Sequence, residues 1–381
     1  MTTEHLEAYS GILSQFESEG RLRRIPPHRD PGRFYDLATN DYMALAFHAD
    51  EFKARFLKEK SWLPFSASAS RMLALSQEAF CSLENLLGSL YGRPALLFNS
   101  GYHANVGLIG ALNVPGTLFL ADKMIHASTI DGLSQRKCEF ERWRHNDPAH
   151  LRRLLEKHRS GYDRFVVLAE SVYSMDGDTA PLAELVALKR EFGNVILVVD
   201  EAHGFGTRGD RGLGLCEEKG LTDDIDIIVG TLGKACASAG AFIVASQLLH
   251  DYLLNTSRPL IFSTALPPIV AAWTELMVSR LVEMKAEREH LAAMSERFRK
   301  GVEEITGREC ASRSQIVPLI TGDAEKAVAI SRQLEENGVI ALPIRRPTVP
   351  PGGERIRFSL NADLTADDID RILTIIRKAS K

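Results

Sequence analysis

An acid and a histidine close one short apolar run of the sequence. Asp200 directly follows the run Val195–Val199, and His203 lies three residues further on. Such a run predicts a buried strand, and ligands bind at the carboxyl edge of open α/β sheets. A carboxylate there is costly unless a cation meets it, and a protonated pyridine nitrogen is such a cation. His203 could bind a phenolic oxygen of the same ring; the alternatives are an ordinary capping acid and a surface histidine.

A threonine and a lysine follow the next apolar run, Ile225–Val229. Thr231 and Lys234 lie three residues apart in the segment Gly230–Lys234. A lysine that loses water among small residues has a lowered pKa, so its amine can form an imine with a carbonyl group. Thr231 could donate its hydroxyl to a phosphate. The alternative for Lys234 is an exposed side chain.

A third group of polar residues follows the apolar run Ala95–Phe98. The segment Asn99–Asn105 is expected to open a helix, so Ser100 and Gly101 would offer a hydroxyl and free backbone N–H groups at its N-terminus. Such a helix start favours phosphate by geometry and by dipole, although ordinary capping is the alternative.

The order of these groups along the chain is more specific than any one of them. A phosphate cradle comes first, then His126, then Asp200 with His203, and finally Lys234. An acid that keeps a pyridine nitrogen protonated makes pyridoxal 5'-phosphate (PLP) an electron sink. The sequence therefore predicts a PLP enzyme with its cofactor held as a Schiff base on Lys234.

The elements that must position these residues alternate between strands and helices. Strands are predicted at Ala95–Phe98, Thr117–Leu120, Phe165–Ala169, Val195–Val199, Ile225–Val229 and Ala241–Val244, and helices between them at Glu78–Tyr91, Pro148–His158 and Leu182–Phe192. This alternation predicts an α/β fold with a mostly parallel sheet covered on both faces.

Three regions are expected along the chain. Residues 1–35 form an N-terminal helix and segment, residues 36–266 a large cofactor-binding domain, and residues 267–381 a smaller α/β domain with its linking helix. That helix is expected to run from about Pro267 toward Ile305. Strands at Val339–Leu342 and Arg355–Ser359 follow it.

Composition excludes several other classes of protein. The 381 residues are 45% hydrophobic and carry a net charge of −4, so neither a nucleic-acid partner nor a membrane is expected. The N-terminus lacks the apolar core of a signal peptide. The five cysteines form no CxxC pair, so we expect neither disulfides nor a metal site, and a reducing cytoplasm fits.

Two motifs are typical of nucleotide-binding proteins, but the sequence lacks the segments that should accompany each of them. Val198–Gly204 contains the letters DEAH of certain ATPases, yet no GxxxxGK[ST] phosphate loop accompanies it. Gly204–Gly209 matches GxGxxG, yet it continues into a glycine-rich loop instead of opening a helix directly after a strand. We therefore set aside nucleotide binding.

The motifs resemble the α-oxoamine synthases, a fold-type I PLP-dependent transferase family, from about Leu13 to Ile376. The matching stretches are Asn40–Tyr42, Asn99–Asn105, Asp122–Ser128, Ser174–Asp178, Asp200–Gly204, Thr231–Lys234, Phe262–Pro268 and Arg346–Pro350. One stretch departs from the family, since Ser66–Arg71 reads SASASR where relatives are glycine-rich.

The resemblance implies a role for each matching residue. Lys234 would carry the cofactor, Asp200 pair with its ring nitrogen, and His126 stack on the ring. Further cofactor or phosphate contacts would come from Ser100, Gly101, Tyr102, Ser174, His203, Thr231 and, across a homodimer, Thr264. Substrate would be bound by Arg23, Asn40, Thr348 and Arg357.

The resemblance also implies a reaction. Arg346–Pro350 and Arg355–Phe358 favour a member that condenses L-alanine with a pimeloyl thioester, with loss of CO2 and free thiol, in biotin biosynthesis. The thioester could be on coenzyme A or on an acyl carrier protein. The alternatives are a glycine C-acyltransferase of the 2-amino-3-ketobutyrate CoA ligase type and a PLP aminotransferase; retention of Lys234 argues against a protein without catalysis.

Overall fold

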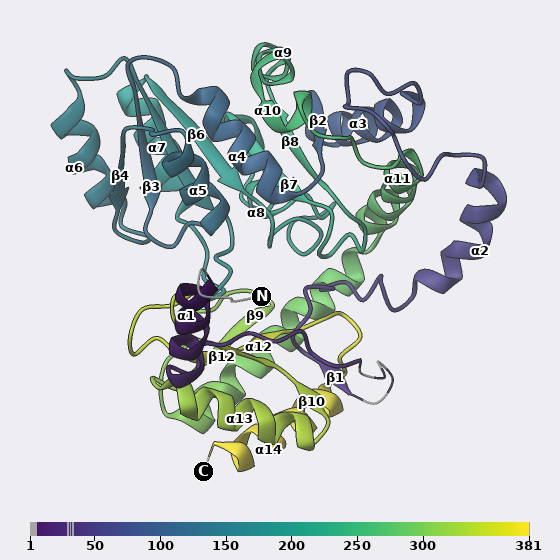
Figure 1. The fold of residues 1–381 in the computed structure, drawn as a ribbon, viewed down its shortest axis with the longest axis vertical. Helices are drawn as coiled ribbons and strands as arrows, with labels where there is room; N and C mark the ends of the chain where they lie inside the picture. Colours follow the sequence, from purple (N-terminus) through teal and green to yellow (C-terminus); the bar gives the residue numbers. More distant parts are fainter. Residues whose placement is uncertain (1–5, 29, 31, 33, 381) are drawn as a thin grey trace.

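The computed structural model describes residues 6–28, 30, 32 and 34–380, which form a larger and a smaller body (Figure 1). The larger body contains a seven-stranded sheet, and the smaller one contains a three-stranded and a two-stranded sheet. This arrangement confirms the predicted fold class. The division at residues 35 and 266 stays a prediction.

The large sheet has the strand order β2-β8-β7-β6-β5-β3-β4. Strand β8 runs antiparallel to both of its neighbours, and the other pairs are parallel. The strands are β2 Ala95–Phe98, β3 Thr117–Asp122, β4 Phe140–Trp143, β5 Arg164–Glu170, β6 Val195–Asp200, β7 Ile227–Thr231 and β8 Ala241–Ala245.

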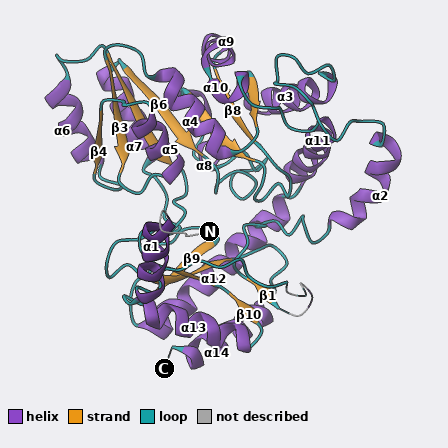
Figure 2. Ribbon diagram, viewed as in Figure 1, coloured by secondary structure: helices purple, strands orange, loops and turns teal. Residues whose placement is uncertain are grey.

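The central strands are apolar throughout because both faces of the sheet are buried. In β5, Phe165 and Val167 pack into one core cluster, whereas Val166 and Leu168 pack into the other. Helices cover both faces (Figure 2). They are α3 Glu78–Tyr91, α6 Pro148–His158, α7 Leu182–Phe192 and α11 Pro268–Glu283 with the first cluster, and α4 Gly101–Leu112, α5 Ala127–Gln135, α9 Gln247–Thr256 and α10 Arg258–Ile261 with the second.

The smaller body is built mainly from the C-terminal part of the chain. Its elements are α12 Lys285–Thr306, β9 Ile316–Ile320, α13 Ala324–Glu336, β10 Val339–Ile340, β11 Leu342–Ile344, β12 Arg355–Ser359 and α14 Ala366–Ala379. Strand β1, Tyr35–Asp36, joins it by pairing with β10. The remaining elements are α1 Glu7–Ser18, α2 Ala49–Lys60, α8 Leu215–Glu218 and the short 3₁₀ helix Thr222–Asp224.

Most predicted strands are confirmed within one or two residues. The strand predicted at Val339–Leu342 is wrong: the segment forms β10 and β11, which lie in different sheets because β10 pairs with β1 and β11 with β12. Three further differences have physical causes. Strand β4 was missed because it lies at the edge of the sheet, where only Trp143 is buried and the apolar signal is weak. Strand β7 begins at Ile227 rather than Ile225, because Asp226 turns its carboxylate to the backbone N–H of Leu197. The predicted linking helix is two helices, α11 and α12, which meet at Met284.

No helix in the described residues is long and apolar enough to cross a membrane. All five cysteines are free. Within the same residues, no group of three or more histidines, cysteines or acids is placed to bind a metal ion.

Candidate active site

Acidic side chains lie together at the carboxyl edge of the central strands. Asp200 ends β6 and Glu170 ends β5, and the two residues are direct partners in the parallel register. Thr231 ends β7, next to β6. The sheet therefore brings the predicted cofactor-binding acid and threonine to one edge, as the sequence indicated.

Lys234 lies in the turn between β7 and β8. The turn closes through a hydrogen bond from the backbone N–H of Ala237 to the carbonyl of Lys234, at 2.9 Å, and Ala237 has a φ of 47°. The Lys234 side chain is half-buried, and its Nζ lies 2.9 Å from Nε2 of His203. Burial lowers the pKa of Lys234 to about 8, although Asp200 and Glu170 oppose the shift. At this pKa about a tenth of the amine is neutral, and thus nucleophilic, at pH 7, far more than for an ordinary lysine.

His203 is buried and lies between Lys234 and Tyr42. Its Nδ1 lies 2.7 Å from the hydroxyl of Tyr42. Burial, followed by the charges of Lys234 and Arg357, lowers the pKa of His203 well below its ordinary value. The imidazole is therefore neutral, with one nitrogen a donor and the other an acceptor.

Asp200 is buried and held in a fixed orientation. Its carboxylate accepts hydrogen bonds from Asn105 Nδ2 and from the backbone N–H of Ala202, both at 2.9 Å. Asn105 also donates to Ser128 Oγ at 3.0 Å, and that hydroxyl lies 2.8 Å from Nδ1 of His126. Burial lowers the pKa of His126. One hydrogen-bonded series thus joins the predicted nitrogen-binding acid to the predicted stacking histidine.

Glu170 is a site residue that the sequence reasoning missed. It is 2% exposed, and its Oε1 has no hydrogen-bond partner in the described part of the protein. Burial and the neighbouring Asp200 raise its pKa well above the ordinary value. Its signal was a single acid at the end of the apolar run Phe165–Ala169. Asn105 and Tyr42 were inside motifs that had been noted, but neither had been given a role.

Helix α4 begins at the segment that the sequence predicted to bind phosphate. Ser100 caps this helix, with its hydroxyl 3.2 Å from the backbone N–H of His103. A Cβ atom at Gly101 would lie 2.6 Å from Cγ2 of Thr231, so only glycine lets the helix start approach β7 this closely. The hydroxyl of Thr231 donates to the carbonyl of Ala202 at 3.2 Å. Tyr102, on the exposed side, donates to Asp131 at 2.6 Å.

Arg357 and Arg355 lie on the same face of β12 but reach different partners. Arg357 Nε donates to the carbonyl of Ser174 at 2.6 Å, and both terminal nitrogens lie 3.2 Å from Oδ1 of Asn40. Arg355 instead forms an ion pair with Asp176 and donates to Met175 O at 3.2 Å. The structure therefore groups Arg357, Asn40 and Ser174, and it directs Arg355 to a loop.

Three residues that the sequence predicted to bind substrate or cofactor lie outside the hydrogen-bonded groups around Lys234, Asp200 and Arg357. Arg23 is exposed, and its charge adds to burial in lowering the pKa of Arg345. Thr348 is exposed, and its backbone N–H donates to the carbonyl of Arg345 at 3.0 Å. Thr264 is exposed and pairs with Ser70 in an isolated β-bridge. Their predicted contacts require a substrate or a second subunit.

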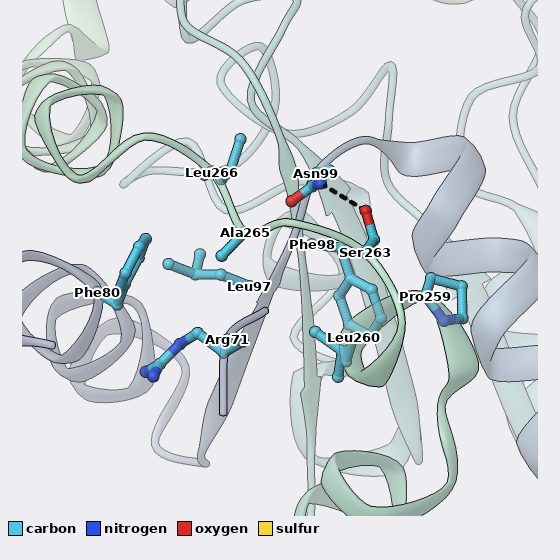
Figure 3. A pocket seen from close by; sticks show the side chains of 10 residues that line it. All are labelled: Arg71, Phe80, Leu97, Phe98, Asn99, Pro259, Leu260, Ser263, Ala265 and Leu266. Carbon is cyan, nitrogen blue, oxygen red and sulfur yellow. Dashed lines mark hydrogen bonds between the residues drawn. The ribbon is translucent and has the colours of Figure 1, made fainter. Parts of the chain in front are cut away.

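A separate small cavity of about 10 Å³ lies where the neighbours of Thr264 in the sequence, Ser263 and Ala265, meet the end of β2 (Figure 3). Asn99 Nδ2 donates to Ser263 Oγ at 3.2 Å on one side, and Arg71 and Phe80 lie on the other. Arg71 pairs with Glu84 at 2.7 Å, which anchors the unusual Ser66–Arg71 stretch. None of the residues hydrogen-bonded around Lys234 lines this cavity.

The residues around Lys234 fit PLP on three observations: an amine of lowered pKa, an oriented buried carboxylate at the same sheet edge, and a close glycine cradle at a helix start. Together with the sheet that positions them, they define a PLP-dependent enzyme of fold type I.

Comparison with known proteins supports this class. Residues 33–376 match the model of the family described as aminotransferase class I and II. The 8-amino-7-oxononanoate synthase of Haemophilus ducreyi is 44% identical over 382 residues, which cover 96% of this chain and 98% of that protein. The chain belongs to the aminotransferase class I and II family, and its cofactor is pyridoxal 5'-phosphate.

Solved structures share the fold along nearly the whole chain. A serine palmitoyltransferase variant from S. paucimobilis with a bound PLP–myriocin aldimine has a TM-score of 0.88 at 28% identity, covering 100% of this chain and 98% of its own. An 8-amino-7-oxononanoate synthase from Francisella tularensis has a TM-score of 0.76 at 25% identity, covering 91% and 98%. The fold is thus common to two enzymes with different names, and the serine palmitoyltransferase structure contains PLP.

Proposed function

We propose that the protein condenses L-alanine with a pimeloyl thioester to give 8-amino-7-oxononanoate, CO2 and free thiol, as a step of biotin biosynthesis. The observation that carries the proposal is the connection of Lys234, through His203 and Tyr42, to the buried Arg357 and the half-buried Asn40. An amine that can move a proton and a guanidinium that can hold a carboxylate thus share one site. The full-length relative from Haemophilus ducreyi supports the choice of reaction.

The first task of the site is to hold the cofactor and the amino acid. We assign Asp200 to the ring nitrogen, His126 to stacking on the ring, and the Ser100–Tyr102 helix start with Thr231 to the phosphate. Ser174 and His203 are assigned to the phenolic oxygen. Arg357 can grip a carboxylate through two parallel hydrogen bonds, with Asn40 beside it, and this fork fixes the plane of the carboxylate.

The second task is proton transfer. When bound, PLP supplies an electron sink for the bond that is broken at the amino acid's Cα. Lys234 then takes the Cα proton as a neutral amine and later returns one, so its lowered pKa matches the work of a general base. The new carbon–carbon bond replaces the thioester bond, the thiol leaves with a proton, and the carboxylate leaves as CO2.

We also propose that two chains form the active enzyme. Thr264 of each subunit would contact the phosphate of the cofactor bound to the other subunit. The support is an exposed apolar surface on segments joined by the Ser70–Thr264 bridge. Its members are Phe65 at 74% exposure, Leu73 at 72%, Leu75 at 98% and Phe262 at 69%. Large apolar side chains exposed on segments that pair with each other favour a protein interface. The free cysteines support a reducing cytoplasm as the place of action.

A substrate panel tests the proposed function. Alanine, glycine and serine are each offered with pimeloyl-CoA, pimeloyl-acyl carrier protein and palmitoyl-CoA, and products are read by mass spectrometry with CO2 and thiol assays. The proposal predicts 8-amino-7-oxononanoate from alanine, with one CO2 and one thiol for each product. The Lys234→Ala protein is the control. A product from glycine alone, or amino transfer without thiol release, would contradict the proposal.

A further inference from the structure

Asn105 and Ser128 connect two residues assigned to the cofactor ring, although neither had been given a role of its own. Both side chains are buried, Asn105 at 5% exposure and Ser128 at 0%. Asn105 Nδ2 lies 2.9 Å from Oδ2 of Asp200 and 3.0 Å from Oγ of Ser128, and this hydroxyl lies 2.8 Å from Nδ1 of His126. Two buried polar side chains thus join the acid assigned to the ring nitrogen to the histidine assigned to stack on the ring.

The start of α5 fixes the state of one nitrogen of His126. His126 is the N-cap residue of this helix, and the backbone N–H of Ser128 donates to its Nδ1 at 3.2 Å. A backbone N–H can only donate, so Nδ1 must accept with its lone pair. Turning the ring over would place a carbon-bound hydrogen against this donor, so the same contact also fixes which ring atom lies there.

The hydroxyl of Ser128 donates to the same nitrogen. The carboxylate of Asp200 offers only acceptors, so the Asn105 atom that faces it belongs to the NH2 group. The second hydrogen of this group is directed to Ser128 Oγ, which therefore accepts from Asn105. The single hydroxyl proton of Ser128 then serves the 2.8 Å contact with His126 Nδ1. Because Nδ1 accepts two hydrogen bonds, the ring proton of His126 is on Nε2.

A neutral His126 ring follows from these two bonds. A proton on Nδ1 would face two donor hydrogens, so the charged form could exist only if both bonds were broken. Loss of water around the ring also lowers the pKa of His126; Asp200 and Asp131 oppose this shift, and Lys234 adds to it. A cation stacked on a pyridinium ring would repel it, so a neutral His126 favours the protonated ring nitrogen to which Asp200 is assigned.

We propose that Ser128 and Asn105 are positioning residues that hold His126 as a neutral ring with its proton on Nε2 and link this state to Asp200. His126 then offers the cofactor a neutral stacking face and keeps a single N–H donor. The tautomer rests only on the geometry around Ser128. The link to the cofactor rests on the proposed function, in which His126 and Asp200 are assigned to the PLP ring.

Nitrogen-15 NMR of the PLP-loaded protein with labelled histidine tests the tautomer directly. Two-bond couplings report which ring nitrogen carries the proton. The His126 signal is identified by its loss in His126→Asn, whose side chain can still cap α5. In the unaltered protein at about pH 7.5, we expect a proton on Nε2 and none on Nδ1. A proton on Nδ1 would overturn the proposal, and this measurement requires no variant of Ser128 or Asn105 to fold.

Ser128→Ala removes one of the two hydrogen bonds that Nδ1 accepts. The neutral ring loses stabilisation, so the protonation constant of His126, measured by the same NMR signal against pH, should rise roughly two- to tenfold. Ser331→Ala is the matched control, because the hydroxyl of Ser331 donates to the carbonyl of Ala341 at 2.8 Å in the smaller body. This control should leave the titration unchanged. A Ser128→Ala protein that titrates like the unaltered one would refute the role of the hydroxyl.

Asn105→Ala tests the link to Asp200 when the bound PLP is labelled at its ring nitrogen. The variant removes one donor from Asp200 and one from Ser128 Oγ, so the signals of the ring nitrogen and of His126 should both shift, whereas neither should shift in Ser331→Ala. A ring-nitrogen signal that stays the same in Asn105→Ala would refute the link. If no thioester yields product while both signals behave as predicted, the proposed function fails and the roles of Ser128 and Asn105 stand.

Discussion

Replacing Arg357 with lysine tests the assignment of the substrate carboxylate site. Arg357 donates a hydrogen bond from Nε to the carbonyl of Ser174, and both of its terminal nitrogens donate to Asn40 Oδ1. A carboxylate at the place of that amide oxygen would receive two parallel charged hydrogen bonds. Lysine keeps the charge but has a single nitrogen, so at least one of these bonds is lost.

The expected loss can be estimated from that missing bond. A hydrogen bond to a charged group contributes about 1.5–3 kcal/mol, so alanine should bind roughly ten- to 150-fold more weakly to Arg357→Lys. PLP binding and its visible absorbance should be unchanged, since no cofactor contact is assigned to Arg357. Titration of alanine into the PLP-loaded protein, followed by absorbance, measures the effect.

Arg355→Lys is the matched control on the same face of β12. Arg355 reaches Asp176 and the carbonyls of Met175 and Gly353, so its replacement should change alanine affinity less than about threefold. If Arg355→Lys loses the affinity and Arg357→Lys keeps it, the assignment of the carboxylate site is wrong by two residues.

Three other predictions follow from the site. Asp200→Asn keeps only one of the two acceptor oxygens that bind Asn105 and the backbone N–H of Ala202, so the protein should still fold, with a somewhat lower thermal unfolding midpoint, while turnover falls about a hundredfold or more; near-normal turnover would contradict its role. Because the pKa of Lys234 is lowered to about 8, the rate at which the PLP-free protein takes up PLP should rise with pH to about 8 and then level off, and a continued rise toward pH 10.5 would refute this. Inactive Lys234→Ala chains mixed with inactive Thr264→Ala chains should regain activity through one intact site in each mixed dimer, whereas a fully active monomer in sedimentation would exclude sharing.

The sequence was most informative where a strand ends in a chemically unusual residue. Asp200, Thr231 and Lys234 could be placed at one sheet edge because buried parallel strands are apolar throughout and their ends are distinct. The phosphate cradle was predicted for the same reason, since Gly101 follows β2 at a helix start.

The contacts between distant segments could not be predicted in this way. Tyr42 and His203 are 161 residues apart in the sequence, and Arg357 and Asn40 are 317 apart. Their meeting depends on which distant segments pack together, which no local pattern records. Glu170 was missed because a single acid after an apolar run is equally typical of a surface-exposed strand end.

The central claim is that Lys234 is the cofactor lysine. Borohydride converts a reversible lysine–PLP linkage into a stable one, so the treated protein can be digested and its labelled peptide identified by mass spectrometry. The account predicts the label on Lys234 and no stable label in Lys234→Ala. A label on any other lysine of the unaltered protein would contradict the site described around Lys234.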